Sequence, residues 1–311
     1  MSGEPLPPHS QELLISRVTG ELAHARTKPL APALYLVATP IGNLSDITIR
    51  ALAVLSSADT IYVEDTRHSG KLLSHYGIST PMRAYHEHNA ERERPKIISA
   101  LLEGKRVALI SDAGTPLISD PGFKLVRDVI AAGAIAISIP GPSAVLAALC
   151  ASGLPTHAFQ FVGFLPAKQG ERCAKLNELK KIAATLVFFE SPTRVEALLN
   201  DLSEAFGDRQ GVVARELTKL HEEIVRAPLP KLYQKFKNTT VKGECVVLVG
   251  PPPKTTATDE EIVERLTVCL DDMSLRDAAR EVADEMSVAK GRVYDLGLKM
   301  KTERLSSRDQ Q

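Results

Sequence analysis

The stretch RVALISDAGTPLISDPGFKLVRDVIAAGAIAISI, residues 106–139, indicates the fold class of this chain. Residues 106–111 are apolar on both faces, which is typical of a strand in a parallel sheet that is covered on its two sides. Residues 122–132 follow with helical spacing and stop at Gly133, a residue type that commonly ends helices. Residues 134–139 form a second buried apolar run. This strand–helix–strand order predicts an α/β fold with a mostly parallel sheet.

The same alternation extends toward the N-terminus. Strands are expected at residues 34–39 and 60–63, and helices after Asp46 and at residues 91–102. We therefore predict an N-terminal α/β domain over residues 33–141. The preceding residues 1–32 show little periodicity, and we expect a flexible leader with a short helix near residues 11–22.

The C-terminal half predicts a second α/β domain, over residues 142–252. Helical segments separate four short apolar runs that are strand candidates, at residues 159–162, 186–189, 212–215 and 245–249. A proline linker at residues 251–253 closes this domain.

Residues 253–311 predict a small helical tail, because they carry no strand pattern. We expect three short amphipathic helices, and residues 275–300 have the pattern of a helix-turn-helix. One apolar face is formed by Leu275, Ala278, Ala279 and Val282, and the next helix contributes Val293, Leu296 and Met300.

Composition limits the function without identifying it. The chain has 38 basic and 38 acidic residues, which excludes a protein coated with positive charge but leaves a local basic patch open. Its four cysteines lie far apart, so we predict neither a metal site nor a disulfide framework. No apolar run approaches the roughly 20 residues of a membrane helix, and the first residues do not have the pattern of a signal peptide. We expect a cytoplasmic protein that does not enter membranes.

The first candidate for chemistry is ATPIGNLSDIT, residues 38–48, between a strand and a helix. Pro40 and Gly42 allow a tight turn whose main-chain groups can face a ligand. A plain strand–helix turn is an equal alternative.

The second candidate is VEDTRHS, residues 63–69, at the end of the next strand. Glu64, Asp65 and Arg67 leave the strand where parallel sheets form their ligand crevice. An ion pair between Asp65 and Arg67 that only shapes the loop explains the pattern equally well.

Two further loops follow buried strands. In ISDAGTPLISDPG, residues 110–122, small residues leave room for a flat ligand, and Asp112 or Asp120 can accept hydrogen bonds from it. For Asp120 we favour the role of a helix cap. In PGPSAVLAAL, residues 140–149, Ser143 is a good helix cap that can also touch a ligand.

The second domain offers polar groups at its strand ends. They are Glu190 in FFESP, and Glu216 and Thr218 in ARELTK. Surface ion pairs with Arg194 and Lys219 are the alternative roles of the two glutamates. The dinucleotide and phosphate-loop glycine motifs are absent from the sequence, which weakens nucleotide-binding interpretations.

In this order, the segments LVATPIGNLSDIT, VEDTRHSGKLLSHYGI, ISDAGTPLISDPG, PGPSA, GFLPAK, FFESP and ARELTK resemble the ribosomal RNA small-subunit methyltransferase I family, which has the tetrapyrrole-methylase fold. Seven segments in one order are far more specific than any single motif. The resemblance covers roughly residues 33–251 and extends to the helical tail. The leader is longer than the family's core needs.

The resemblance implies a function and a cofactor site. Such enzymes transfer a methyl group from S-adenosylmethionine to the 2′-oxygen of a decoding-centre cytidine in 16S rRNA, with the 30S subunit as the expected partner. It also implies two α/β domains with a cofactor cleft between them, and a homodimer. The cofactor contacts that it implies are Pro40, Ile41, Gly42, Asn43, Asp112, Ala113, Gly114, Thr115, Ser143, Phe189, Glu190, Leu217 and Thr218.

A ribose hydroxyl is a poor nucleophile while it is protonated, so a base beside it would help. Our hypothesis is that Asp65, Glu190 or Glu216 assists the deprotonation. Arg67 would position a phosphate or carboxylate.

RNA contacts are expected from three basic segments, at residues 168–181, 231–242 and 290–301. Each is equally well explained as a solvated helix face. In the tail, Lys290 and Arg292 are the candidates for contacting RNA.

Two rival functions stay open at this point. One is an enzyme of the same fold that acts on a tetrapyrrole or another small acceptor. The other is a non-catalytic RNA-binding protein of ribosome assembly, which predicts no cofactor affinity.

Overall fold

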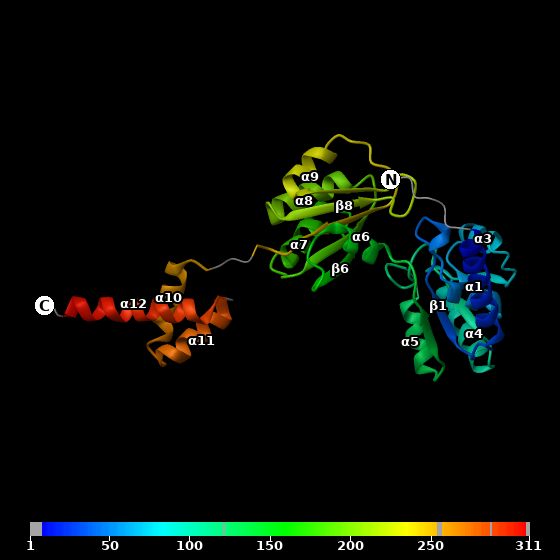
Figure 1. Ribbon diagram of the computed structural model, residues 1–311, viewed down its shortest axis with the longest axis horizontal. Helices are drawn as coiled ribbons and strands as arrows, with labels where there is room; N and C mark the ends of the chain where they lie inside the picture. Colours follow the sequence, from blue (N-terminus) through cyan, green and yellow to red (C-terminus); the bar gives the residue numbers. More distant parts are fainter. Residues whose placement is uncertain (1–7, 121, 254–256, 287, 309–311) are drawn as a thin grey trace. The chain divides into compact units, whose positions relative to one another are not determined.

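The computed structural model describes residues 8–120, 122–253, 257–286 and 288–308 (Figure 1). The chain divides into two compact units, Met1–Pro251 and Pro252–Gln311. The first unit contains two five-stranded sheets, and the second is helical. This architecture confirms the predicted α/β class with a helical tail.

The first sheet is parallel throughout and has the strand order β3-β2-β4-β1-β5. Its strands are β1 (Leu34–Val37), β2 (Thr60–Val63), β3 (Met82–Ala84), β4 (Val107–Leu109) and β5 (Ala136–Ile139). The central strand β4 is buried at every residue, as its apolar sequence predicts. The three-residue edge strand β3 was not predicted.

Helices pack on both faces of this sheet, so two separate apolar clusters form. One cluster joins Leu55 and Leu73 to the sheet, and the other joins Ile97 and Leu125 to the opposite face. The helices are α2 (Ile49–Ser57), α3 (Thr66–His75), α4 (Ala90–Leu102) and α5 (Phe123–Ala131), with a short 3-10 turn, η1 (Leu44–Asp46). Doubly covered parallel strands end at one edge, where loops are free to build a site.

The second sheet is mixed, with the order β6-β7-β10-β8-β9. Only the pair β6–β7 is parallel, and the remaining pairs are antiparallel. Its strands are β6 (Phe159–Phe164), β7 (Thr185–Glu190), β8 (Gln210–Arg215), β9 (Glu223–Pro228) and β10 (Cys245–Val249). The edge strand β9 was not predicted, whereas β10 has the predicted bounds.

Helices also cover both faces of the second sheet. One face carries α7 (Gln169–Leu179), α8 (Val195–Phe206) and α9 (Leu229–Phe236). The other face carries α6 (Ala144–Ser152), whose Val145 and Leu149 share a buried cluster with Ile41 from the first sheet's loops. This shared cluster joins the two halves of the first unit.

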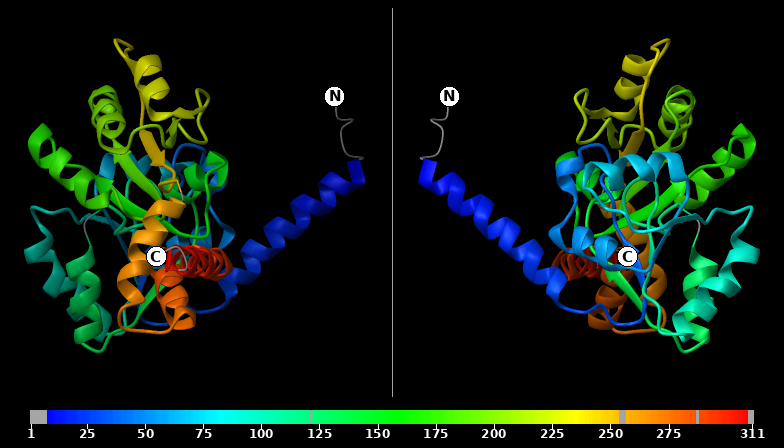
Figure 2. Two further views of the ribbon diagram at one scale, coloured as in Figure 1. Left: turned by 90° about the vertical axis from the view of Figure 1, so that its left-hand side faces the viewer. Right: turned by 90° about the vertical axis from the view of Figure 1, so that its right-hand side faces the viewer.

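The leader contains more helix than we expected. Residues predicted to be flexible, with a helix only near 11–22, form α1 (Pro8–Thr27), a single continuous helix (Figure 2, blue). Its contacts are with α2. Its exposed apolar side chains include Leu13, Leu14 and Ile15.

The second unit consists of α10 (Asp259–Cys269), α11 (Leu275–Met286) and α12 (Lys290–Arg308) within its described residues. A capping box between Thr258 and Glu261 begins α10. The predicted apolar face of α11 is buried, and Val293 of α12 packs into the same cluster. The helical pattern of the tail is thus confirmed.

Candidate functional site

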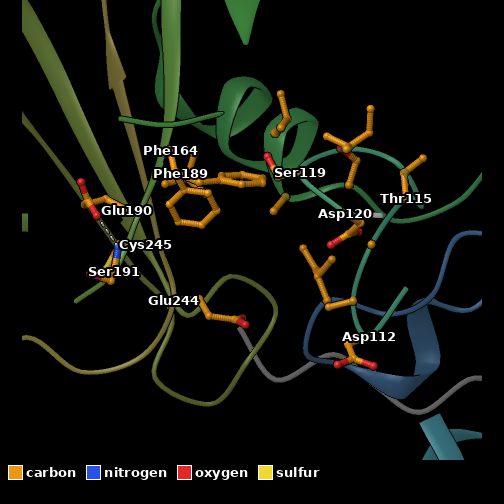
Figure 3. Close-up of a pocket in the computed structure, with 18 of the residues that line it drawn as sticks. Asp112, Thr115, Ser119, Asp120, Phe164, Phe189, Glu190, Ser191, Glu244 and Cys245 are labelled. Atoms are coloured by element: carbon orange, nitrogen blue, oxygen red, sulfur yellow. Dashed lines mark hydrogen bonds between the residues drawn. The ribbon is translucent and has the colours of Figure 1, made fainter. Parts of the chain in front are cut away.

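A cavity of about 430 Å³ lies where loops from both sheets meet (Figure 3). This volume is within the usual range of small-molecule sites. The loops leave the carboxyl ends of β1, β4, β5, β6 and β7, and the start of the antiparallel β10 adds a further segment. The lining residues are Ile41, Asp112, Ala113, Gly114, Thr115, Ile118, Ser119, Asp120, Ser143, Ala144, Val145, Phe164, Phe189, Glu190, Ser191, Pro192, Glu244, Cys245 and Val246.

The loop after β4 forms one wall, and the backbone holds it in place. Gly114 exchanges two backbone hydrogen bonds with Thr39, of 2.8 and 3.0 Å. Gly114 has φ of 80°, a conformation that glycine adopts without strain. The Thr115 hydroxyl donates to the Pro142 carbonyl over 3.2 Å, which ties this loop to the loop before α6. Both loops therefore present short side chains and main-chain groups to the cavity.

Phenylalanine rings form the apolar wall on the second sheet. The Phe189 ring lies edge-on to Phe161 and Phe164, with ring centroids 4.9 and 5.7 Å apart. Phe164 lines the cavity and is 57% exposed. Rings in this arrangement suit the flat face of an aromatic ligand.

Glu190 at the end of β7 is buried although it is acidic. Its Oε1 accepts a 2.8 Å hydrogen bond from the Ser191 amide and lies 3.3 Å from Nε of Arg194. Its Oε2 has no hydrogen-bond partner among the residues that the structure describes. Burial raises the pKa of the Glu190 carboxyl, and the Ser191 amide and Arg194 oppose this shift. A buried carboxylate oxygen without a partner is uncommon, because burial removes the water that would otherwise satisfy it.

Four carboxylates line the cavity, and none of its lining side chains is basic. They are Asp112, Asp120, Glu190 and Glu244. Such a cavity favours a ligand that carries positive charge, because a low local dielectric strengthens the attraction.

Ser143 has the capping role that its sequence context predicts. It is the N-cap of α6, where its hydroxyl accepts from the Leu146 amide over 3.4 Å. It also lines the cavity.

The structure keeps Asp65 and Arg67 outside the cavity lining. Asp65 is the N-cap of α3, and its carboxylate pairs with Arg67 over 3.1 Å. That pairing lowers the pKa of the Asp65 carboxyl. The connection to the site is indirect, since the Asp65 amide donates to Oδ1 of Asp112 over 3.2 Å.

Glu216 likewise lies outside the lining. Its carboxylate accepts from Nζ of Lys219 over 2.9 Å and from the Glu244 amide over 3.1 Å. The hydrogen bond from Lys219 lowers the pKa of the Glu216 carboxyl. Glu216 therefore supports the segment that carries Glu244.

Most of the first candidate loop also supports the cavity rather than lining it. Ile41 reaches the cavity, whereas Pro40, Gly42 and Asn43 do not. From the loop after β8, Leu217 is buried in the cluster that contains Ile41, and the Thr218 hydroxyl accepts from the Asn43 amide. Of the predicted contacts, the structure thus brings eight to the cavity, which are Ile41, Asp112, Ala113, Gly114, Thr115, Ser143, Phe189 and Glu190.

Our favoured role for Asp120 was wrong. Helix α5 begins at Phe123 with Gly122 as its N-cap and has no side-chain capping bond. Asp120 lines the cavity instead, and its other expected role, to accept a hydrogen bond from a ligand, stays a prediction. The lining residues that we missed are Ile118, Ser119, Ala144, Val145, Phe164, Ser191, Pro192, Glu244, Cys245 and Val246. All of them except Glu244–Val246 stand in motifs that we noted. Cys245 and Val246 were predicted only as part of a strand, and no motif marked Glu244.

Two negative findings concern the described residues only. No group of three or more His, Cys, Asp or Glu side chains is arranged to hold a metal ion. No helix there is both long and apolar enough to cross a membrane.

Comparison with protein families matches both units. A family model described as tetrapyrrole (corrin/porphyrin) methylases matches residues 33–233. A second model, described as the RsmI C-terminal HTH domain, matches residues 256–301.

Two curated relatives carry one name, ribosomal RNA small subunit methyltransferase I. The protein from Mesorhizobium japonicum is 50% identical over 277 residues, which is 88% of this chain and 94% of the relative. The protein from Vibrio cholerae is 46% identical over 273 residues, which is 86% of this chain and 95% of the relative.

Solved structures support the fold. A cobalt precorrin-4 methyltransferase aligns with a TM-score of 0.54 at 20% identity, over 70% of this chain and 95% of that chain. A diphthine synthase aligns with a TM-score of 0.56 at 15% identity, over 70% and 90% of the two chains.

Proposed function

This chain belongs to the ribosomal RNA small subunit methyltransferase I family, and on that premise we propose that it methylates the ribose 2′-hydroxyl of a decoding-centre cytidine in 16S rRNA. At the coarser level, it is a methyltransferase of the tetrapyrrole-methylase fold that acts on ribosomal RNA. The choice of cytidine and of its 2′-oxygen follows from the family resemblance of the sequence motifs.

S-adenosylmethionine is the cofactor of this family, and the cavity fits it. The cofactor combines a flat adenine with a cationic sulfonium and an ammonium group. The cavity offers apolar and aromatic walls, four carboxylates and no basic lining side chain. This match of charge and shape is the observation that carries the proposal.

We assign the eight predicted residues that line the cavity to direct cofactor contacts. Gly42, Asn43, Leu217 and Thr218 act one step away, because they hold the loop that carries Ile41. Pro40 precedes Ile41 in the same loop. When bound, S-adenosylmethionine supplies a methyl group that the positive charge on sulfur already activates.

The protein's own contribution is mainly positioning. The Thr39–Gly114 and Thr115–Pro142 hydrogen bonds hold the loops that form the cavity walls. Well-oriented reactants can contribute roughly 7–11 kcal/mol of barrier lowering. Of the three bases that we considered, only Glu190 lines the cavity, while Asp65 and Glu216 are held by Arg67 and Lys219.

The proposed RNA partner is 16S rRNA within the 30S subunit, in the cytoplasm, and the proposed assembly is a homodimer. In the first two basic segments, Lys168 and Lys175 pair with acidic neighbours, and Lys237 lies over the Tyr233 ring. In the tail, Arg292 pairs with Asp259 over 2.6 Å, which joins α12 to α10. Lys290 is exposed and is therefore the better candidate in that segment for contacting phosphate.

A same-fold enzyme acting on a small acceptor is the second candidate, since solved neighbours include a precorrin methyltransferase. The tail distinguishes the two, because its match to the RsmI C-terminal domain favours an RNA acceptor. A non-catalytic assembly protein would leave the acidic cavity without a ligand.

Transfer of labelled methyl from S-adenosylmethionine to 30S subunits that lack the modification tests the proposal. Label recovered as 2′-O-methylcytidine supports both the reaction and the acceptor. Label absent from rRNA despite cofactor binding favours a small acceptor, and absence of cofactor binding favours the assembly role. Deleting residues 255–311 is expected to weaken RNA binding more than cofactor binding; equal losses would contradict an RNA role of the tail.

A further inference from the structure

Asp120 lies on the loop between β4 and α5. It lines the cofactor cavity on one side, and behind the loop it lies beside Glu64, Tyr85 and Ser111. Figure 3 shows its carboxyl group facing the middle of the cavity, opposite the rings of Phe164 and Phe189. The side chain therefore stands between a ligand site and an acidic interior.

The backbone of this loop is held in an unusual conformation. Leu117 and Ser119 have positive φ values of 73° and 66°, which side-chain-bearing residues seldom adopt. Gly122, at φ of 137°, would bring a Cβ within 3.2 Å of Leu109. Strained backbone of this kind is concentrated at functional sites, where the surrounding structure holds it.

Asp120 has no structural task that would explain a partly buried carboxyl. It does not cap α5, and no described basic side chain forms an ion pair with it. The groups that face it on the first sheet are Glu64, Asp112 and the Ser111 hydroxyl.

The other lining carboxylates are already engaged. Asp112 accepts from the Asp65 amide, and Glu244 pairs with Lys219 at 2.9 Å while 73% exposed. Glu190 is held by Arg194, and its free oxygen is closed off from solvent. Among the four, Asp120 lines the cavity without an ion pair to a described basic side chain, and its hydrogen bond comes from the neighbouring Ser111 hydroxyl.

We propose that Asp120 is the general base that accepts the proton of the acceptor hydroxyl. The inference rests on the proposed function. As the acceptor oxygen bonds to the methyl carbon, its proton passes to the Asp120 carboxylate. The methyl–sulfur bond breaks, and its electron pair stays on sulfur as a neutral thioether. Asp120 then releases the proton to solvent.

The electrostatics support this role. Burial, and then the neighbouring Glu64, raise the pKa of Asp120 to about 6, against the opposing hydrogen bond from Ser111. A general base is most effective when its pKa lies close to the working pH. The other titratable groups nearby are Asp112 and Tyr85 on the first sheet and Glu190 and Glu244 across the cavity, while His86 acts on Glu64.

The test is the single-turnover rate of methyl transfer to 30S subunits as a function of pH. For the wild type, the logarithm of the rate should rise with pH and level off near the Asp120 pKa of about 6. Asp120→Asn should lower the rate by about 10²–10⁴-fold and abolish this rise. Calorimetry should show that Asp120→Asn still binds S-adenosylmethionine. Asp120→Glu should restore the rise of the rate with pH.

Two further variants separate catalysis from folding. Glu64→Gln removes the negative charge behind Asp120. The inflection in the plot of log rate against pH should therefore move to lower pH. A purely structural role of Asp120 would not produce this shift. Glu244→Gln removes another lining carboxylate, and the inflection should stay near pH 6.

Three outcomes overturn the inference. An Asp120→Asn enzyme with the wild-type rate and inflection excludes Asp120 as the base while leaving the methyltransferase function intact. If Asp120→Asn unfolds or no longer binds the cofactor, an unchanged inflection in Glu64→Gln decides against the proposal. If the wild type labels no ribose in rRNA, the proposed function itself fails, and Asp120 fails with it.

Discussion

The Asn43 amide donates a 3.1 Å hydrogen bond to the Thr218 hydroxyl, although the two residues are 175 positions apart. This bond joins the loop after β1 of the first sheet to the loop after β8 of the second. Gly42 lies at the same contact, and both Glu216 and Thr218 have positive φ values there, of 51° and 66°. The two loops are thus held together beside Ile41, which lines the cavity.

Replacing Gly42 should separate these loops. A Cβ at this position would lie 2.4 Å from Cγ of Lys219 and 3.0 Å from the Leu217 carbonyl oxygen. We expect Gly42→Ala to lower the free energy of unfolding by about 1–3 kcal/mol and to weaken cofactor binding. Thermal unfolding and calorimetry with S-adenosylmethionine measure the two effects.

Gly170→Ala is the matched control for Gly42→Ala. Gly170 lies in the first turn of α7, and nothing lies within 4 Å of its Cβ position. Alanine there should stabilise the protein by up to about 1 kcal/mol, because it favours the helix. Equal effects of the two substitutions would contradict the close approach of the loops.

The buried pair of Arg172 and Asp201 should be essential for stability. The Nε–Oδ2 distance is 2.6 Å, and the two side chains are only 6% and 1% exposed. Asp201→Ala leaves a buried, unpaired guanidinium and should cost about 3–5 kcal/mol in chemical denaturation. Because Arg172 also donates to the Ala167 carbonyl, the loop that follows Phe164 should loosen.

The exposed pair of Lys175 and Glu178 provides the comparison on the same helix. Its side chains are 47% and 65% exposed. Lys175→Ala should change stability by no more than about 0.5 kcal/mol. If Lys175→Ala lowered the free energy of unfolding as much as Asp201→Ala, burial would not determine how much the loss of an ion pair destabilises the protein.

Asp59 should make stability depend on pH in the acid range. Its hydrogen bonds with Arg106 lower the pKa of Asp59 from 3.8 to about 2. Since the folded-state pKa is depressed, this stabilisation is fully present above about pH 4 and is lost as the pH falls toward 2. The carboxylate and guanidinium are 30% and 36% exposed, so the contribution is only about 1 kcal/mol after allowance for solvent screening.

Urea denaturation of Asp59→Asn at a series of pH values measures this contribution. The variant should be less stable than wild type at pH 7, and the difference should shrink as the pH falls below about 4. Glu171→Gln, which removes the exposed pair with Lys168, should change stability at pH 7 by no more than about 0.5 kcal/mol. A difference for Asp59→Asn that is constant with pH would rule out the ion pair as its source.

The helical tail contains its own pair of glycines for comparison. At Gly297 a Cβ would lie 2.3 Å from Cδ1 of Leu275 and 3.0 Å from Cδ2 of Leu266, whereas at Gly291 it would meet nothing within 4 Å. Gly297→Ala should therefore destabilise the packing of α12 by about 1–3 kcal/mol. Gly291→Ala should stabilise the helix slightly. Thermal unfolding followed by circular dichroism should show a lower Tm for Gly297→Ala and a slightly higher Tm for Gly291→Ala. Equal changes in Tm would contradict the close packing at Gly297.

Local patterns in the sequence predict the central elements well. β4 and β10 are buried apolar runs, and the apolar spacing of α11 identifies its buried face. The edge strands β3 and β9 escape prediction because they are partly exposed and lack such a run. A strand of this kind is defined by its hydrogen-bonded neighbour, which local composition does not reveal.

The sequence by itself determined the α/β class, the helical tail, the strand-end loops and, through their resemblance, the family. The tertiary structure decided which of those loops face the cavity: it places Glu190 there, turns Asp120 toward it, and leaves Asp65 and Glu216 in ion pairs outside it. It also brings Glu244 to the cavity, although no local sequence motif marks this residue as part of a site. The physical reason is that the spacing of apolar residues along a segment determines its local conformation. Whether a side chain reaches a site depends on contacts between segments that lie far apart in the chain.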